Sequence, residues 1–70
     1  MNIVIEYCVV WNYEPRALSL RDELFLLGTA ALKPGARGAF EIIVDGVLLF
    51  SKLELDRFPN DGEIIQLLKE

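Results

Sequence analysis

The dipeptide Asp45-Gly46 separates two short runs of β-branched and other apolar residues, 39–44 and 47–50. Asp-Gly between such runs is typical of a tight β-hairpin, because both residues tolerate the positive φ that the turn requires. The sequence therefore predicts two antiparallel strands over these ranges. A chain of 70 residues has room for one small core, so we expect the hairpin to belong to a single domain over 1–70.

Two further segments read as strands. Residues 2–7 alternate in character, with Ile3, Ile5 and Tyr7 on one face, which is the period of a β-strand. Cys8 follows at the C-terminal end of this strand. Residues 29–33 indicate a brief strand, and the composition of 34–38, Pro-Gly-Ala-Arg-Gly, predicts a loop before the hairpin.

Helical spacing appears twice. Ala17, Leu20, Leu24 and Leu27 recur every three or four residues, which predicts an amphipathic helix that begins near Pro15 and stops before residue 28, a glycine. After a polar connection over 51–58, Asn60 or Asp61 is expected to cap a second helix, with Glu63 reaching back to free amides. The expected buried stripe of this helix comprises Ile64, Ile65, Leu67 and Leu68.

The predicted order is strand, helix, three strands and helix. A strand-helix-strand unit pairs its strands in parallel, whereas the hairpin adds antiparallel strands. We therefore expect an α/β fold of order βαβββα, with a mixed four-stranded sheet and both helices on one face. This is a two-layer sandwich.

Composition excludes several kinds of chemistry. The chain has no histidine and one cysteine, which rules out His-dependent nucleophilic catalysis and a zinc site of Cys and His ligands. The net charge of −4 with scattered basic residues argues against nucleic acid as a partner. A lone cysteine, no signal-peptide pattern and no long apolar run favour a cytoplasmic protein without a membrane anchor.

An ordered set of short motifs resembles the SelT/SelW/SelH family, also called the Rdx family, of thioredoxin-like proteins. The set comprises residues 4–8 (Val-Ile-Glu-Tyr-Cys), 9–13, Arg16-Ala17, 38–42 (Gly-Ala-Phe-Glu-Ile), Asp45-Gly46, 50–52 and 57–59 (Arg-Phe-Pro). The resemblance covers nearly the full chain. It implies a thioredoxin-like fold, similarity to selenoprotein W and a redox-active site at the end of the first strand.

One departure from the family pattern changes the expected chemistry. The family carries Cys-x-x-Cys or Cys-x-x-selenocysteine, whereas this chain reads Cys8-Val9-Val10-Trp11. An indole cannot resolve a mixed disulfide, so an intramolecular dithiol cycle is impossible. Selenocysteine is encoded by UGA, which differs from the tryptophan codon UGG by one base, so reading the codon tests whether Trp11 is a misread selenocysteine.

Two interpretations of Cys8 stay open. A thiol between a strand end and a helix N-terminus can be reactive, which predicts an oxidoreductase that uses the single thiol Cys8 with glutathione or a partner protein as the external resolving thiol. Alternatively, Cys8 is a small buried apolar residue. Trp11 and Tyr13 are candidate contacts for a ligand or partner, or they pack on the helix and loop. Arg37 is either a partner for a thiolate or a glutathione carboxylate, or a solvated side chain.

The uncovered sheet face suggests another function. With the Glu6 and Glu41 side facing outward, Val4, Ile43 and one alternating set from 47–50 would form an apolar patch. The second hypothesis is therefore a non-catalytic interaction module or homodimer that kept the fold and lost the relay. The alternative is that these residues complete a small core.

Overall fold

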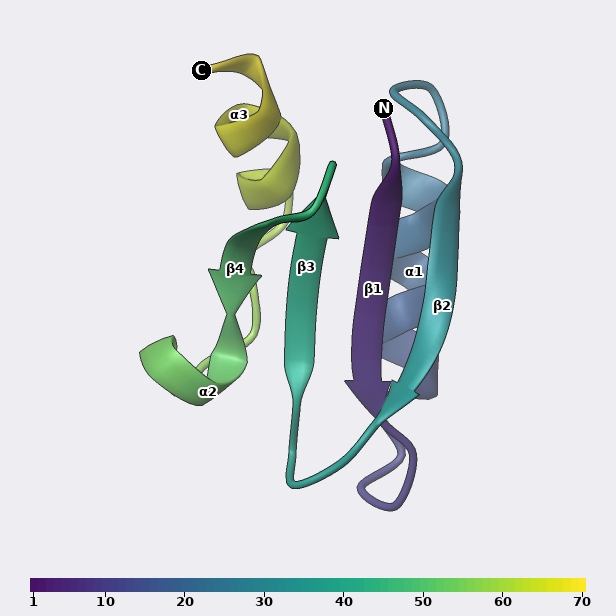
Figure 1. The fold of residues 1–70 in the computed structure, drawn as a ribbon, viewed down its shortest axis with the longest axis vertical. Coiled ribbons are helices and arrows are strands. Elements are labelled where there is room, and N and C mark those ends of the chain that lie inside the picture. The colour runs from purple at the N-terminus through teal and green to yellow at the C-terminus, as the bar shows by residue number, and fades with distance from the viewer.

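A computed structural model describes residues 1–70 and contains a four-stranded sheet with three helices (Figure 1). The elements in chain order are β1 (Ile3–Cys8), α1 (Glu14–Glu23), β2 (Ala30–Gly35), β3 (Phe40–Val44), β4 (Val47–Ser51), α2 (Lys52–Leu55) and α3 (Glu63–Lys69). None of the helices has the length and apolar character needed to cross a membrane.

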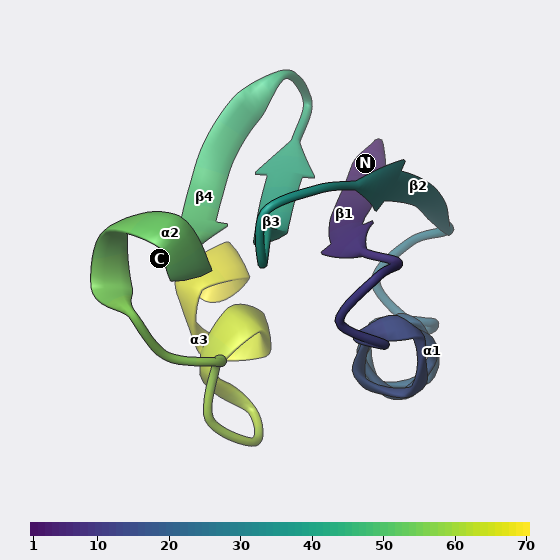
Figure 2. The ribbon, with the colours of Figure 1, turned by 90° about the horizontal axis from the view of Figure 1, so that it is seen from below.

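The sheet has the strand order β2-β1-β3-β4, and its pairing confirms the predicted mixed topology. β1 pairs in parallel with β2, whereas β1 with β3 and β3 with β4 pair antiparallel. Seen from below, α1 and α3 lie on the same side of the sheet, α1 under β1 and α3 under β3 and β4 (Figure 2). The two-layer α/β sandwich is therefore confirmed.

The core lies between the sheet and these two helices. Ile3 and Ile5 of β1 are paired with Val44 and Ile42 of β3, so their side chains share the helix-facing side. They pack in one cluster with Leu20 from α1 and other apolar residues of both layers. This arrangement buries the strand face that the alternation in residues 2–7 predicts.

The hairpin forms at the predicted dipeptide. Asp45 has φ 51° and Gly46 has φ 81°, the positive values that a two-residue turn between twisted strands requires. A bulge between Ile42 and Ile43 shifts the register of β3 against β4. As a result, Phe50 pairs with Ile42 on the helix side, and Leu48 pairs with Ile43 on the uncovered side.

The first helix is shorter than predicted. α1 ends at Glu23, and the N–H groups of Leu27 and Gly28 both donate to the carbonyl oxygen of Leu24, which closes the chain into a turn. Leu24 is buried, but Leu27 is 37% exposed. The prediction that Leu27 lies on the buried face of the helix is therefore wrong, because the chain leaves the helix before the helical turn that would contain Leu27.

The expected loop over 34–38 begins two residues later than predicted. Pro34 and Gly35 belong to β2, where they pair with Tyr7 and Cys8. Proline is tolerated in this strand because β2 lies at the edge of the sheet, where one side of the backbone has no partner strand. The connection between β2 and β3 therefore contains only residues 36–39.

The polar connection over 51–58 contains a short helix, α2, that the sequence analysis did not predict. The Ser51 hydroxyl accepts a hydrogen bond from the N–H of Glu54 and donates to the Glu41 carboxylate at 2.5 Å. The same carboxylate accepts the N–H of Lys52 at 3.0 Å. Glu41 is consequently buried rather than facing water as expected, because it anchors the first turn of α2.

The last helix begins later than predicted but uses the predicted acid. Gly62, at φ 78°, precedes α3, and neither Asn60 nor Asp61 caps the helix through its side chain. The Glu63 carboxylate accepts the N–H of Asn60 at 2.9 Å, as expected. It also accepts two hydrogen bonds from the Arg57 guanidinium at 2.7 and 2.8 Å. These contacts, led by Arg57, lower the pKa of Glu63 to about 2.

Candidate functional site

Cys8 is the last residue of β1, where the strand runs into the turn before α1. Its N–H donates to the carbonyl oxygen of Ala39 at 2.8 Å, so the connection between β2 and β3 returns beside it, as predicted. The thiol is free, and the residue is 0% exposed. The structure therefore puts Cys8 at the predicted strand end but in a buried environment, which matches the packing interpretation of this residue.

The turn formed by residues 9–12 lies against the sulfur. The N–H of Asn12 donates to the carbonyl of Val9 at 3.0 Å, and the N–H of Tyr13 donates to the carbonyl of Cys8 at 3.1 Å. Within this turn the backbone N–H of Trp11 points at the Cys8 Sγ atom at 3.4 Å. A donor in this position interacts more strongly with a sulfur that carries negative charge than with a neutral one.

The N-terminus of α1 contributes less positive charge at the Cys8 sulfur than the sequence predicts. α1 begins at Glu14, six positions after Cys8, and the first turn carries the negative charge of Glu14. The partial positive charge of a helix falls off within its first turn. The Trp11 amide, rather than the end of α1, is therefore the donor that the structure supplies to the sulfur.

Trp11 lies across the loop that precedes β3. A Cβ atom added at Gly38, which has φ +77°, would lie 2.6 Å from the Cζ3 atom of the Trp11 ring. Only a residue without a Cβ allows this approach. The indole is nevertheless 59% exposed. Trp11 thus covers the loop and also presents an aromatic surface to solvent, which combines the two interpretations of this residue.

Tyr13 belongs to a row of aromatic rings. Its ring meets Trp11 edge to face at a centroid distance of 6.1 Å and Phe58 at 4.7 Å. Phe58 in turn contacts the buried ring of Phe40 at 5.2 Å. The row therefore connects the turn over Cys8 to the core.

Arg37 lies in the loop beside this surface. Its backbone has φ 60°, its side chain is exposed, and it takes part in none of the ion pairs that the structure shows. It directly precedes Gly38, on which the Trp11 ring rests. The structure therefore brings Arg37 to the same loop as Trp11 but shows no contact between Arg37 and Cys8.

Phe58 of the aromatic row and two cations beside it, Arg16 and Lys52, were not predicted as site residues. The Arg16 guanidinium carbon lies 4.1 Å from the centre of the Phe58 ring, and the Lys52 ammonium lies 5.2 Å from it. Cations over aromatic faces are attracted by the ring quadrupole. The available signal was the resemblance, which includes Arg16, residues 50–52 and Arg57-Phe58-Pro59, but the sequence does not show that these segments pack together.

Comparison with known proteins supports the fold and shows the family. Residues 2–70 match the Rdx family. Migration and invasion enhancer 1 of Bos taurus is 35% identical over 72 residues, and that of Mus musculus is 33% identical over 72 residues. Each alignment covers 99% of this chain and 63% of the relative, so the chain spans less than two thirds of these proteins.

Two solved structures are similar to this chain. The selenoprotein W-related protein of Vibrio cholerae has a TM-score of 0.88 and 29% identity over 97% of this chain and 91% of its own. A protein of Bordetella parapertussis has a TM-score of 0.89 and 29% identity over 97% of this chain and 92% of its own. The thioredoxin-like fold is thereby confirmed. With residues 2–70 matched, this chain belongs to the Rdx family, the SelT/SelW/SelH group of thioredoxin-like redox proteins.

Proposed function

We propose that this chain is a thiol-dependent redox protein in which Cys8 is the reacting group and an external thiol such as glutathione releases the adduct. The observation that carries this proposal is the Trp11 N–H directed at the Cys8 Sγ atom at 3.4 Å. This donor is placed to stabilise the negative charge that the sulfur carries when Cys8 attacks a disulfide as the thiolate. Membership of a redox family supports the same assignment.

The proposed cycle uses one protein thiol. The Cys8 thiolate attacks one sulfur of a disulfide, R–S–S–R, so that a Cys8–S–S–R bond forms and R–S⁻ leaves and takes up a proton. A glutathione thiolate then attacks the R sulfur, which restores the Cys8 thiolate and releases the mixed disulfide of R and glutathione. The net reaction consumes one disulfide and one thiol and produces one of each, so the electrons balance without a second cysteine.

Burial requires that the site open before it reacts. Cys8 is 0% exposed, so the turn over residues 9–12 has to move away from the sulfur. The edge of this cover is the Trp11 ring on Gly38. In the open site, Arg37 is the nearby unpaired cation that we assign to a carboxylate of glutathione. A chain with one cysteine suits a reducing compartment, and we propose the cytoplasm.

The test is alkylation of Cys8 in the folded protein across a range of pH, followed by mass spectrometry. We expect slow labelling of the wild-type chain at neutral pH and faster labelling of Trp11→Ala, because that variant lacks the indole that holds the turn closed. Cys8→Ser is the blank for labelling and for glutathione-dependent reduction of a model disulfide. A folded wild-type protein that stays unlabelled at neutral pH would remove the redox assignment.

A second candidate function is a non-catalytic interaction module. It is favoured by the exposure of Val9, Val10 and Trp11, which are 53%, 87% and 59% exposed on the turn that hides the only thiol. Large apolar side chains gathered in this way are typical of partner contacts. The discriminating measurement is partner binding by Cys8→Ser: a module keeps its partner, whereas a thiol-linked complex is lost.

For this second function, the uncovered face of the sheet favours homodimerisation. On the uncovered face Val4 and Ile43 are half-buried, and Leu48 of the edge strand is 48% exposed. A second copy would cover these side chains and remove apolar surface from water. Size determination in solution tests this proposal, because a monomer at high concentration contradicts it.

A further inference from the structure

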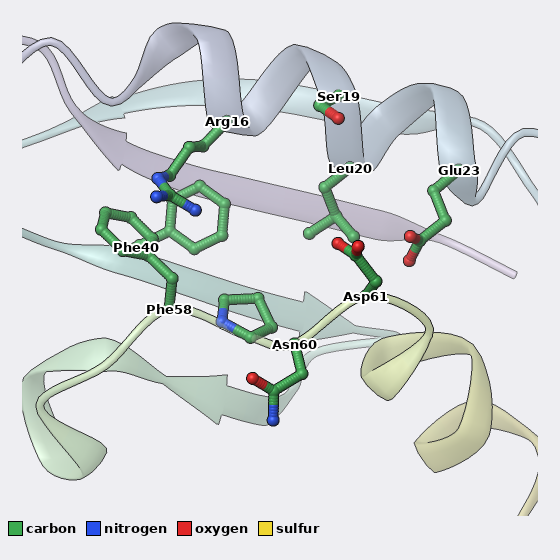
Figure 3. A pocket seen from close by; sticks show the side chains of 9 residues that line it. Arg16, Ser19, Leu20, Glu23, Phe40, Phe58, Asn60 and Asp61 are labelled. Carbon is green, nitrogen blue, oxygen red and sulfur yellow. The ribbon is translucent and has the colours of Figure 1, made fainter.

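A groove on the helix side of the molecule separates α1 from the segment 58–61 that leads into α3 (Figure 3). It encloses a cavity of about 80 Å³, which corresponds to roughly five water-sized positions. Leu20 and Phe58 provide apolar side chains to its lining. The groove therefore combines an apolar surface with open ends, and the polar residues at those ends decide what it can hold.

Four residues of α1 line the groove: Arg16, Ser19, Leu20 and Glu23. Arg16, Leu20 and Glu23 are separated by four and three positions, so they lie on one face of the helix. Arg16 and Glu23 are therefore about 10 Å apart along the helix axis, at 1.5 Å per residue. Figure 3 shows the guanidinium at one end of the groove and the carboxylate at the other, with Leu20 between them.

The cationic end is Arg16. Its guanidinium lies over the Phe58 ring at 4.1 Å and forms no ion pair with any carboxylate of the chain. Stacking on the ring leaves the N–H donors at the edge of the guanidinium free for an acceptor. Ser19 lies on the same helix face and adds a hydroxyl to the lining. This end suits a carboxylate.

The anionic end consists of Glu23 and Asp61. Both residues line the groove, and Glu23 contacts Gly62, the residue that follows Asp61. One oxygen of Glu23 accepts the Gly62 N–H at 3.4 Å, and Asp61 accepts no hydrogen bond. Neither acid forms an ion pair within the chain. Two adjacent carboxylates without a cation favour a positively charged ligand group.

We propose that this groove binds a lysine that has a free α-carboxylate, either the free amino acid or the C-terminal residue of a peptide. The ε-ammonium lies between Glu23 and Asp61, the methylene stem lies against Leu20 and Pro59, and the α-carboxylate meets Arg16. This ligand places a cation at the anionic end of the groove, an apolar stem in the middle and an anion at the cationic end. The proposal does not involve Cys8 and stands apart from the redox function.

The test is an NMR titration of the ¹⁵N-labelled protein with L-lysine. We expect the amide signals of residues 19–23 and 60–62 to shift, with a Kd on the order of tens of millimolar, as for two exposed ion pairs on a small ligand. Nε-acetyl-lysine lacks the ammonium and 1,5-diaminopentane lacks the carboxylate, so each is expected to bind about three- to fivefold more weakly. Equal affinity for lysine and Nε-acetyl-lysine would overturn the proposal.

Matched variants test the two ends of the groove. Asp61→Asn removes one charge from an exposed side chain without hydrogen bonds, and Asp22→Asn on α1 is the control outside the groove. We expect weaker lysine binding only for Asp61→Asn. In Arg16→Gln, lysine is expected to lose its advantage over 1,5-diaminopentane. Equal binding by Asp61→Asn and Asp22→Asn, or shifts outside the groove, would contradict the proposal.

The source of the lysine is resolved by comparing L-lysine with the tripeptide Gly-Gly-Lys. Tighter binding of the tripeptide identifies the end of a polypeptide as the ligand, whereas equal binding identifies the free amino acid, and both results support the groove. A tripeptide amide, which lacks the terminal carboxylate, is expected to bind more weakly than the acid. Undiminished binding of the amide would refute the role of Arg16.

Discussion

Replacing Gly38 by alanine is expected to lift the Trp11 ring from the loop over Cys8. The added Cβ would lie 2.6 Å from the Trp11 Cζ3 atom, and the residue would keep φ +77°. The left-handed backbone costs an L-residue about 1–2 kcal/mol. Trp11 is 59% exposed, so about two fifths of its surface is buried, and exposing that area when the ring is displaced costs about 2 kcal/mol at about 25 cal/mol per Å². The predicted loss of unfolding free energy is about 3–4 kcal/mol.

Gly46 provides the matched control for this prediction. It has φ +81°, but an added Cβ would meet no atom within 4 Å. Gly46→Ala therefore carries the backbone cost of about 1–2 kcal/mol alone. In the Trp11→Ala background, Gly38→Ala is expected to fall to the same value, because the ring that collides with the Cβ is gone. The difference between the two glycine variants isolates the Trp11 contact.

The assay is urea unfolding followed by far-ultraviolet circular dichroism, with tryptophan emission of the folded state as a second signal. Trp11 is the one tryptophan of the chain, so its emission reports directly on this contact. We expect the emission of Gly38→Ala to shift to the red and Cys8 alkylation to accelerate. Equal destabilisation by Gly38→Ala and Gly46→Ala, with unchanged emission, would refute the assignment of Trp11 as the cover of the site.

Three further predictions concern stability and assembly. The pKa of Glu63 is lowered from 4.5 to about 2 by Arg57, so ionised Glu63 stabilises the folded state above pH 4.5, and this stabilisation is lost as the pH falls towards 2. The difference in urea midpoint between wild type and Glu63→Gln should therefore shrink between pH 4.5 and pH 2. Ser51→Ala removes a donor from the buried Glu41 and should cost about 1–3 kcal/mol in urea unfolding, and an unchanged midpoint would contradict the anchor role. If the uncovered sheet face forms a homodimer, Leu48→Lys should reduce the apparent mass to that of a monomer in sedimentation experiments.

Local patterns were sufficient for most of the fold. The alternation of Ile3, Ile5 and Tyr7 identified β1, and Asp45-Gly46 identified the hairpin, because strand faces and tight turns depend on neighbouring residues. The boundaries were less accurate. Leu27 continues the helical spacing, yet the chain turns at Leu24 because hydrogen bonding at the helix end competes with the pattern. The short helix α2 was missed because its anchor, Glu41, comes from a distant strand.

The candidate site likewise has some features that the sequence determines and others that depend on the tertiary structure. The sequence by itself determined that Cys8 ends the first strand, that position 11 holds an indole in place of a second sulfur, and that a dithiol cycle cannot occur. Only the tertiary structure decided that the thiol is buried, that Trp11 rests on Gly38, and that Glu23 and Asp61 line one groove. These properties depend on which distant segments pack together, and residue type and spacing along one chain do not carry that information.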